Sequence, residues 1–157
     1  MKKCMPSNTP RRSALKSLLA AGAMACCVGL TTSAPAQTAP AGAAKNKLVI
    51  QVSDADPKKW ALALNNAKNV QQDLGKDQVD IEVVAYGPGL AMLKLDSEVG
   101  GRVIEALGDG VKLVACENTM TNQKLTRDDM LPKIGYAKAG VVEIMTRQQQ
   151  GYAYIRP

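Results

Sequence analysis

From residue 48 onward, short apolar runs alternate with longer segments in which apolar residues recur at helical spacing. The apolar runs cover residues 48–52, 79–86 and 111–116, and a shorter one covers 152–155. Strands that are apolar without alternation have both faces buried, as in a parallel sheet covered by helices. The pattern therefore predicts strands at these four positions.

The segment after the first run has clear helix boundaries. Asp56 precedes Pro57, so a capping side chain stands directly before a proline at the first helical position. Apolar residues then recur on one face as far as Leu74, and Gly75 supplies a C-terminal stop. We predict a helix over 57–74 whose buried face consists of Trp60, Ala63, Leu64, Ala67, Val70 and Leu74.

Two further helices are expected, over about 98–107 and about 139–150. Ser97 is placed as the N-cap of the first of these. Strands alternating with helices favour an α/β fold with right-handed crossovers. We predict a three-layer α/β/α sandwich with a mainly parallel sheet of about five strands. In the last helix the residues expected to be buried are Val141, Ile144 and Met145.

The first 36 residues have the parts of an export signal. A basic stretch precedes an apolar run over 18–30, whose thirteen residues are too few for a membrane span, and small residues follow with Ala34 and Ala36 in an A-x-A pattern. We predict a cleavable signal over 1–36 and a periplasmic or otherwise exported mature protein, with an uncleaved amphipathic anchor as the alternative. A flexible Ala/Pro-rich linker then covers 37–46 and one domain covers 47–157.

The basic part of this signal resembles a twin-arginine motif. In the run PRRSALK the pair Arg11 and Arg12, the leucine and the lysine match, while Ala14 stands where a bulkier apolar residue is usual. Cys26 and Cys27 raise a lipoprotein alternative. Neither has the Leu-like residue three positions earlier that lipidation requires.

Charge and cysteine content look different once the signal is set aside. The whole chain has a formal charge of +6, but residues 1–36 carry five bases and no acid, so the remaining 15 bases and 14 acids leave +1. A nearly neutral domain offers no field for nucleic acid, and we predict no nucleic-acid partner and no membrane contact after cleavage. The mature chain keeps Cys116 alone of the four cysteines, so it forms no internal disulfide.

The sequence has no histidine, which excludes Ser-His-Asp triads, Cys-His dyads and HExxH zinc sites. Cys116 stands at the carboxyl end of a predicted strand, where open parallel sheets place their ligand sites. Lys124 or Arg127 could lower its pKa, and Glu117 would oppose this. The alternative is a small buried residue that fills the core.

Other candidate positions have plainer explanations beside the functional ones. Gly87 and Gly89 flank a proline after the second strand, where backbone N–H groups could face an anion or simply form a turn. Asn118, near Cys116, is a further candidate for ligand contact. Loop acids are explained by helix capping, and we predict no metal site and no cofactor. Those acids are Asp54, Asp56, Asp128 and Asp129.

Tyr152 and Tyr154 alternate with Ala153 and Ile155 in the last run, so both aromatic side chains point to one side. This pattern favours an edge strand or a subunit interface over a platform for nucleobases.

Four segments of the domain together resemble the DsrE/DsrF-like family of small sulfur-relay proteins, including its YchN-like members. The resemblance spans residues 47–157. It implies a flavodoxin-like α/β sandwich, assembly as a homotrimer or homohexamer, and a cysteine at the matching place, Cys116, that carries sulfur as a persulfide between partner protein thiols. The segments are LVIQVSDADPKKWALALNNAKNV, IEVVAYGPGLAMLK, VKLVACENTM and AGVVEIMTRQQQGYAYIRP.

Two functions follow from these observations. In the first, Cys116 accepts and donates sulfur, as a sulfurtransferase-type carrier. In the second, the protein is a non-catalytic homo-oligomeric binding module outside the cytoplasm, and Cys116 only fills the core.

Overall fold

The computed structural model describes residues 45–157. The predicted signal peptide and linker residues 37–44 lie outside the described part. Strand β1 begins at Asn46, one residue before the predicted domain boundary. No helix within residues 45–157 has the length and apolar character that crossing a bilayer requires.

One five-stranded sheet forms the centre of the fold, in the order β4-β3-β2-β1-β5, and all neighbouring strands run parallel. This confirms the α/β class and the parallel sheet. The four strands predicted from apolar runs are all present, whereas the short β4 was not singled out by the sequence pattern. The strands are β1 (Asn46–Val52), β2 (Val79–Ala85), β3 (Lys112–Cys116), β4 (Gly135–Ala137) and β5 (Ala153–Ile155).

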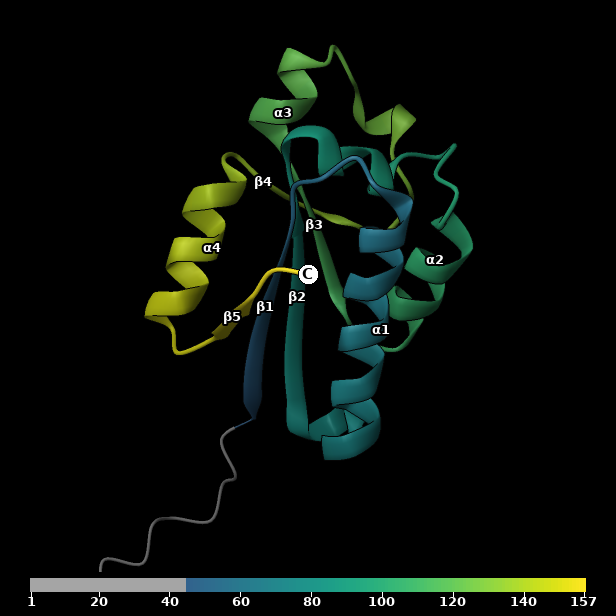
Figure 1. Ribbon diagram of the computed structural model, residues 1–157. Helices are drawn as coiled ribbons and strands as arrows, with labels where there is room; N and C mark the ends of the chain where they lie inside the picture. Colours follow the sequence, from purple (N-terminus) through teal and green to yellow (C-terminus); the bar gives the residue numbers. More distant parts are fainter. Residues whose placement is uncertain (1–44) are drawn as a thin grey trace, which may run out of the picture. The chain divides into compact units, whose positions relative to one another are not determined.

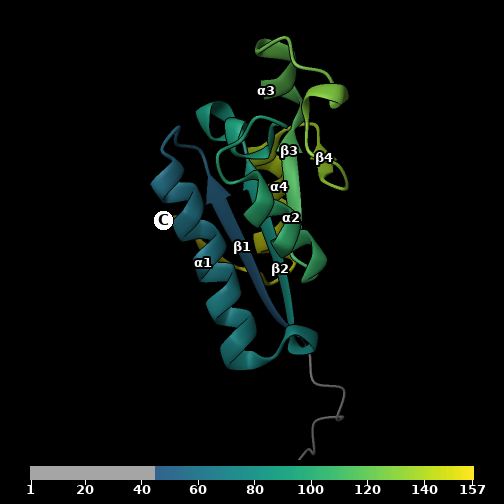
Figure 2. The same cartoon turned by 90° about the vertical axis from the view of Figure 1, so that its right-hand side faces the viewer.

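Helices lie on both faces of the sheet and make the predicted three layers. Helices α1 and α2 cover one face, α4 covers the other, and α3 lies at the carboxyl end of the strands (Figure 1, Figure 2). The α-helices are α1 (Pro57–Leu74), α2 (Gly100–Gly108), α3 (Glu117–Asn122) and α4 (Gly140–Gln149). Three short 3-10 helices are η1 (Lys76–Gln78), η2 (Gly87–Leu93) and η3 (Arg127–Asp129).

Helix α1 begins and ends where the sequence predicts. The Asp56 side chain accepts a 2.9 Å hydrogen bond from the backbone N–H of Lys58, and Gly75 ends the helix with φ of 90°. Trp60, Ala63, Leu64 and Ala67 are buried as predicted, Val70 is half-buried, and the prediction for Leu74 is wrong because it is 47% exposed. Gln71 is buried in its place because its amide donates a 2.8 Å hydrogen bond to the carbonyl of Asp109, beyond the end of α2.

The start of α2 differs from the prediction. The helix begins at Gly100 with Val99 as the N-cap, and Ser97 makes no capping hydrogen bond with its side chain. Ser97 instead belongs to a preceding turn, in which its carbonyl accepts a 2.9 Å hydrogen bond from the N–H of Gly100.

The two faces of the sheet carry cores of very different size. The face under α1 and α2 has a large apolar core that includes the fully buried Ile50, Ile81 and Leu113. The face under α4 has a small core of five buried residues, Val49, Val84, Val114, Ile144 and Tyr152.

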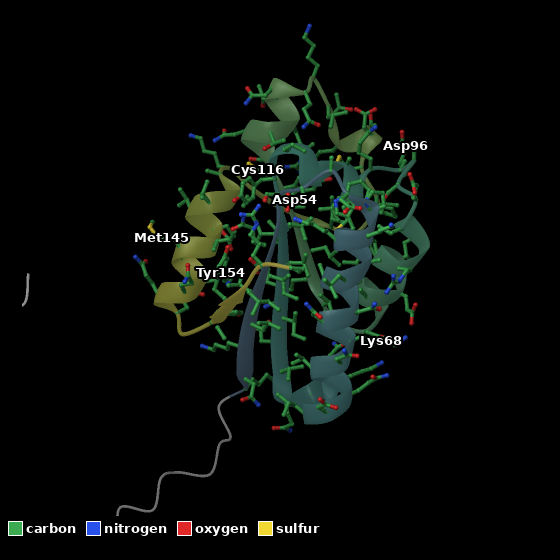
Figure 3. All side chains as sticks on the ribbon, in the orientation of Figure 1. Asp54, Lys68, Asp96, Cys116, Met145 and Tyr154 are labelled. Carbon is green, nitrogen blue, oxygen red and sulfur yellow. The ribbon has the colours of Figure 1, made fainter. Side chains whose placement is uncertain are left out.

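Because the core under α4 is small, α4 buries only a narrow stripe. Ile144 is buried as expected, but the predictions for Val141 and Met145 are wrong: these side chains are 62% and 51% exposed. In Figure 3 Met145 projects from the outer side of α4.

Strand β5 lies at the edge of the sheet, as the alternation of Tyr152 and Tyr154 predicted. The Tyr152 hydroxyl donates to Asp80 over 2.6 Å, and the Tyr154 hydroxyl donates to Gln51 over 2.5 Å. Burial and the hydrogen bond to Asp80 raise the pKa of Tyr152 to about 12.

Candidate functional site

Cys116 is the last residue of β3 and stands directly before α3, at the carboxyl end of the sheet (Figure 3). Its thiol is free, and the residue is 5% exposed. The position at the end of a central parallel strand is the one predicted from the sequence, and it is where folds of this class place ligand sites.

Two backbone groups contact the sulfur, a donor and an acceptor; the thiol itself donates to the Lys138 carbonyl over 3.9 Å. The N–H of Gly140, the first residue of α4, donates to Sγ over 3.3 Å. Burial raises the pKa of the Cys116 thiol, but hydrogen bonding by the Thr119 hydroxyl and by the Gly140 N–H outweighs it and holds the pKa below its ordinary value. Because these donors favour the charged form, they favour the thiolate, which is the nucleophilic form of cysteine.

Two hydrogen bonds join α3 and the residue that follows it to the turn after β2. The N–H of Gly87 donates to the Thr119 hydroxyl oxygen over 3.0 Å, and the Gln123 amide donates to the Gly87 carbonyl over 3.1 Å. Gly87 has φ of 54°, a left-handed conformation that favours glycine. The structure thus brings the predicted candidates Cys116 and Gly87 together through Thr119.

Gly89 is held by a close backbone contact. A Cβ atom there would lie 2.5 Å from the carbonyl oxygen of Val52, so only glycine fits. Its N–H donates to the Tyr86 carbonyl over 3.1 Å. Since the N–H groups of both glycines have partners within the protein, the turn positions Thr119 and the end of β1 in the structure described here.

Gly140 also occupies a crowded position. A Cβ atom there would lie 3.1 Å from Cβ of Tyr86 and 3.3 Å from Val84. The absence of a side chain therefore lets the start of α4 approach β2 closely enough for its N–H to reach Cys116.

Asn118, the third predicted binding candidate, lies at the rim of a hollow beside the thiol. Its N–H donates to the Lys138 carbonyl over 3.1 Å, which ties α3 to the segment before α4. The hollow has a volume of about 330 Å³ and is also lined by Ala137, Lys138, Ala139, Val142 and Glu143.

The cations named by the sequence do not act on the thiol as expected. Arg127 pairs with Glu117 over 3.0 Å and lies over the ring of Tyr136, 4.4 Å from its centroid. Lys124 is exposed in the turn after α3. Backbone N–H groups and the Thr119 hydroxyl take the place of a cation. Thr119 and Gly140 were not identified from the sequence. The one available signal was that Gly140 stands at the predicted start of a helix.

Loop acids serve the fold. Asp54 pairs with Lys59 over 3.2 Å and with Arg156 over 3.4 Å, and the hydrogen bond from Lys59 lowers its pKa. Asp129 closes a capping box with Thr126 around η3. Within residues 45–157, no group of three or more Cys, Asp or Glu residues is arranged to hold a metal ion.

Comparison with known proteins places this fold and site in a family. The sequence model of the DsrE/DsrF-like family matches residues 45–157. The structure resembles that of MTH1491, a protein of unknown function from Methanobacterium thermoautotrophicum, with 38% identity, a TM-score of 0.69, and coverage of 72% of this chain and 100% of the other.

A second solved structure shares the fold. BT1422, a conserved protein of unknown function from Bacteroides thetaiotaomicron, has 15% identity and a TM-score of 0.59, with coverage of 74% of this chain and 99% of the other. No curated protein matches the sequence significantly. The chain belongs to the DsrE/DsrF-like family, and this membership suggests a role related to sulfur relay.

Proposed function

We propose that this protein is a single-cysteine sulfur carrier, in which Cys116 accepts sulfur as a persulfide and passes it to another thiol. The observation that carries the proposal is the 3.3 Å hydrogen bond from the Gly140 N–H to Sγ at the carboxyl end of β3. Together with the lowered pKa of Cys116, this contact supports a thiolate without any imidazole.

The transfer needs no oxidant. The Cys116 thiolate attacks the outer sulfur of a donor persulfide R–S–SH. The bond between Sγ and the outer sulfur forms, the S–S bond of the donor breaks, and R–S⁻ leaves while the proton stays on the transferred sulfur. A second thiolate then attacks that outer sulfur, and Cys116 leaves as the thiolate. The donor is the persulfide, and the acceptor the thiolate, of a low-molecular-weight or protein thiol.

Approach to the sulfur follows from the local geometry. Cys116 is only 5% exposed, and the hollow at Asn118 and Val142 lies beside the segment that covers it. We place donor approach through this hollow, with a small displacement of the segment from Ala137 to Ala139, which precedes α4.

The decisive experiment is to incubate the purified protein with a polysulfide, measure the intact mass, and locate any added sulfur by peptide mapping. Mapping matters because Cys4, Cys26 and Cys27 remain in any uncleaved chain. We expect one added sulfur on the Cys116 peptide, absent in Cys116→Ser and removed by a second thiol with return of the free cysteine. Absence of an adduct at Cys116 contradicts the carrier.

The burial of Cys116 favours the second candidate, a non-catalytic homo-oligomeric binding module. The same experiment separates the two. A native thiol that reacts with neither polysulfide nor a small alkylating reagent, but reacts fully after unfolding, supports a core residue and the binding module.

Self-association belongs to both candidates, as a homotrimer or homohexamer. The outer side of α4 presents Val141, Val142 and Met145, each more than half exposed, beside Tyr154 of the edge strand β5. These residues line a hollow of about 400 Å³. Neighbouring exposed apolar side chains of this kind favour contact with another protein surface.

Export completes the proposal and rests on residues 1–36 of the sequence. We expect the mature protein in the periplasm, with an N-terminus near Gln37. Cell fractionation and N-terminal sequencing test the site, and substitution of Arg11 and Arg12 by lysine tests the twin-arginine route. An intact N-terminus in the cytoplasm contradicts export.

A further inference from the structure

A groove separate from Cys116 lies beside the first part of β3, which the short β4 leaves uncovered, and residues from both faces of the sheet line it. Its volume is about 470 Å³, within the range of small-molecule pockets. Its walls mix apolar and charged residues, and the charged ones come from β2, β3, α4 and the segment before β4. The apolar lining residues include Leu107, Val111, Leu113, Val114 and Tyr136.

Glu82 of β2 is a fully buried carboxylate in the lining of this groove. Oε2 forms an ion pair with Arg147 over 2.8 Å, and neither Oε1 nor Oε2 has a hydrogen-bond partner within residues 45–157. Nε of Arg147 is also buried without a partner there. An unpaired buried polar atom is costly, so an acceptor and a donor in one groove indicate a ligand that both donates and accepts.

The charges in the groove also indicate a ligand with both a positive and a negative group. Arg147 is shared between two carboxylates, Glu82 and Glu143, at 2.8 and 2.9 Å, which leaves one negative charge in excess when both are ionised; burial raises the pKa of Glu82. Lys112 is already paired with Asp80 over 2.8 Å. At the rim, Lys133 is exposed and makes no ion pair within the described part of the chain. The groove therefore offers one uncompensated negative site and one uncompensated positive site.

We propose that this groove binds an α-amino acid with an apolar side chain. The ammonium group donates to Oε1 of Glu82 and faces Glu143, the carboxylate accepts from Nε of Arg147 and faces Lys133, and the side chain lies against the apolar walls. An α-amino acid suits the site because its cation and anion are adjacent, as the unpaired acceptor and donor are. The inference does not depend on the chemistry of Cys116.

Titration of the purified protein with leucine, followed by calorimetry and amide NMR, tests the proposal. Two analogues separate the charges: 3-methylbutan-1-amine lacks the carboxylate, and 4-methylpentanoic acid lacks the ammonium group. We expect saturable binding of leucine, shifts at the Gly110 and Gly135 amides that line the groove, and binding of either analogue weakened by at least about tenfold, as the loss of a charged hydrogen bond implies.

Two variants identify the residues. Glu82→Gln keeps the size of the side chain and should weaken leucine binding by at least about tenfold. Lys133→Met does not touch the core, because Lys133 is exposed, and should also weaken binding. The matched controls are Glu98→Gln and Lys58→Met, both at exposed positions outside the groove; they should bind leucine as the wild type does.

Three outcomes overturn the inference. The first is no saturable binding of leucine, methionine or phenylalanine, which means that water alone satisfies Glu82 and Arg147. The second is equal affinity for the amino acid and its two analogues. The third is a leucine affinity that is unchanged in folded Glu82→Gln and in Lys133→Met, or amide shifts only at residues outside the groove. Either result means that leucine binds at another site.

Discussion

The backbone nitrogen of Gly140 lies 3.3 Å from Sγ of Cys116, so the first residue of α4 contacts the last residue of β3 at the carboxyl end of the sheet. The N-terminus of a helix carries partial positive charge, which favours an anion at this distance. A chain without histidine thereby stabilises a thiolate with backbone groups, and this contact can be tested directly.

Replacing Gly140 by alanine should weaken the contact. The new Cβ would lie 3.1 Å from Cβ of Tyr86, so the start of α4 must move away from β2 and its N–H away from the sulfur. We expect a higher thiol pKa, several-fold slower alkylation of Cys116 near neutral pH, and a loss of about 1–3 kcal/mol in the free energy of unfolding.

The matched control is Gly101→Ala in the first turn of α2, where a Cβ meets nothing within 4 Å. It should leave the alkylation rate unchanged and should not destabilise the fold. Equal alkylation profiles for wild type and Gly140→Ala would show that the helix N-terminus does not tune the thiol.

Thr119 should tune the same thiol from the other side. Its hydroxyl lowers the pKa of Cys116 and accepts the N–H of Gly87 over 3.0 Å, so Thr119→Val removes both interactions at nearly constant volume. We expect a raised thiol pKa and a loss of about 1–2 kcal/mol in stability. Thr121→Val in the same helix removes only an exposed bond to the Glu117 carbonyl and should leave the thiol pKa as it is. An unchanged alkylation profile in folded Thr119→Val contradicts the role.

Folding stability should depend on pH through Cys116. The thiol pKa is lower in the folded protein than in the unfolded chain, where it is about 8.5. The resulting stabilisation is fully present above the unfolded-state value and is lost as the pH falls through the folded-state value.

Chemical denaturation under reducing conditions measures this effect. Wild type should exceed Cys116→Ala in stability by a larger margin at about pH 9.5 than at about pH 6. The volume lost in the alanine variant contributes equally at both values. A margin that is constant, or larger at low pH, would mean that the folded protein does not favour the thiolate.

The sequence predicted those parts of the fold that local patterns determine. The boundaries of α1 follow from Asp56, Pro57 and Gly75, and the position of Cys116 follows from an apolar run that ends there. The exposure of Val141 and Met145 could not be predicted, because helical periodicity identifies an apolar face but not whether the same chain covers it.

The groups that act on the thiol could not be predicted either. Thr119 and Gly140 reach Cys116 only because the turn at Gly87 and the start of α4 pack against β3. The partnerless atoms of Glu82 and Arg147 depend on how two strands and a helix meet. Such tertiary juxtapositions leave no periodic signal in one sequence.

Lys124 should be replaceable by glycine with a gain in stability. It has φ of 55° and ends α3 in a Schellman motif, in which the N–H of Leu125 donates to the Met120 carbonyl over 2.9 Å. Glycine adopts this conformation without the Cβ penalty. We expect Lys124→Gly to gain about 0.5–1 kcal/mol in chemical denaturation.

Lys124→Val should lose stability at the same position, because a β-branched residue fits a left-handed conformation poorly. A lysine at another exposed position serves as the control: Lys58→Gly, within α1, should destabilise the protein. A Lys124→Gly variant less stable than wild type would show that the lysine side chain contributes more than the backbone conformation costs.

The outer side of α4 should control self-association. Val141 and Met145 are 62% and 51% exposed, so the folded monomer should tolerate glutamate at either position. A charged side chain there opposes burial of this face against a second copy. We expect the wild type to be an oligomer by light scattering and Val141→Glu and Met145→Glu to dissociate. The control is Leu62→Glu on α1, which is 46% exposed in the opposite layer and should leave the oligomer intact. A monomeric wild type contradicts self-association. Each of the three substitutions replaces one exposed apolar side chain by the same charge, so dissociation by Leu62→Glu alone would assign the interface to the α1 side.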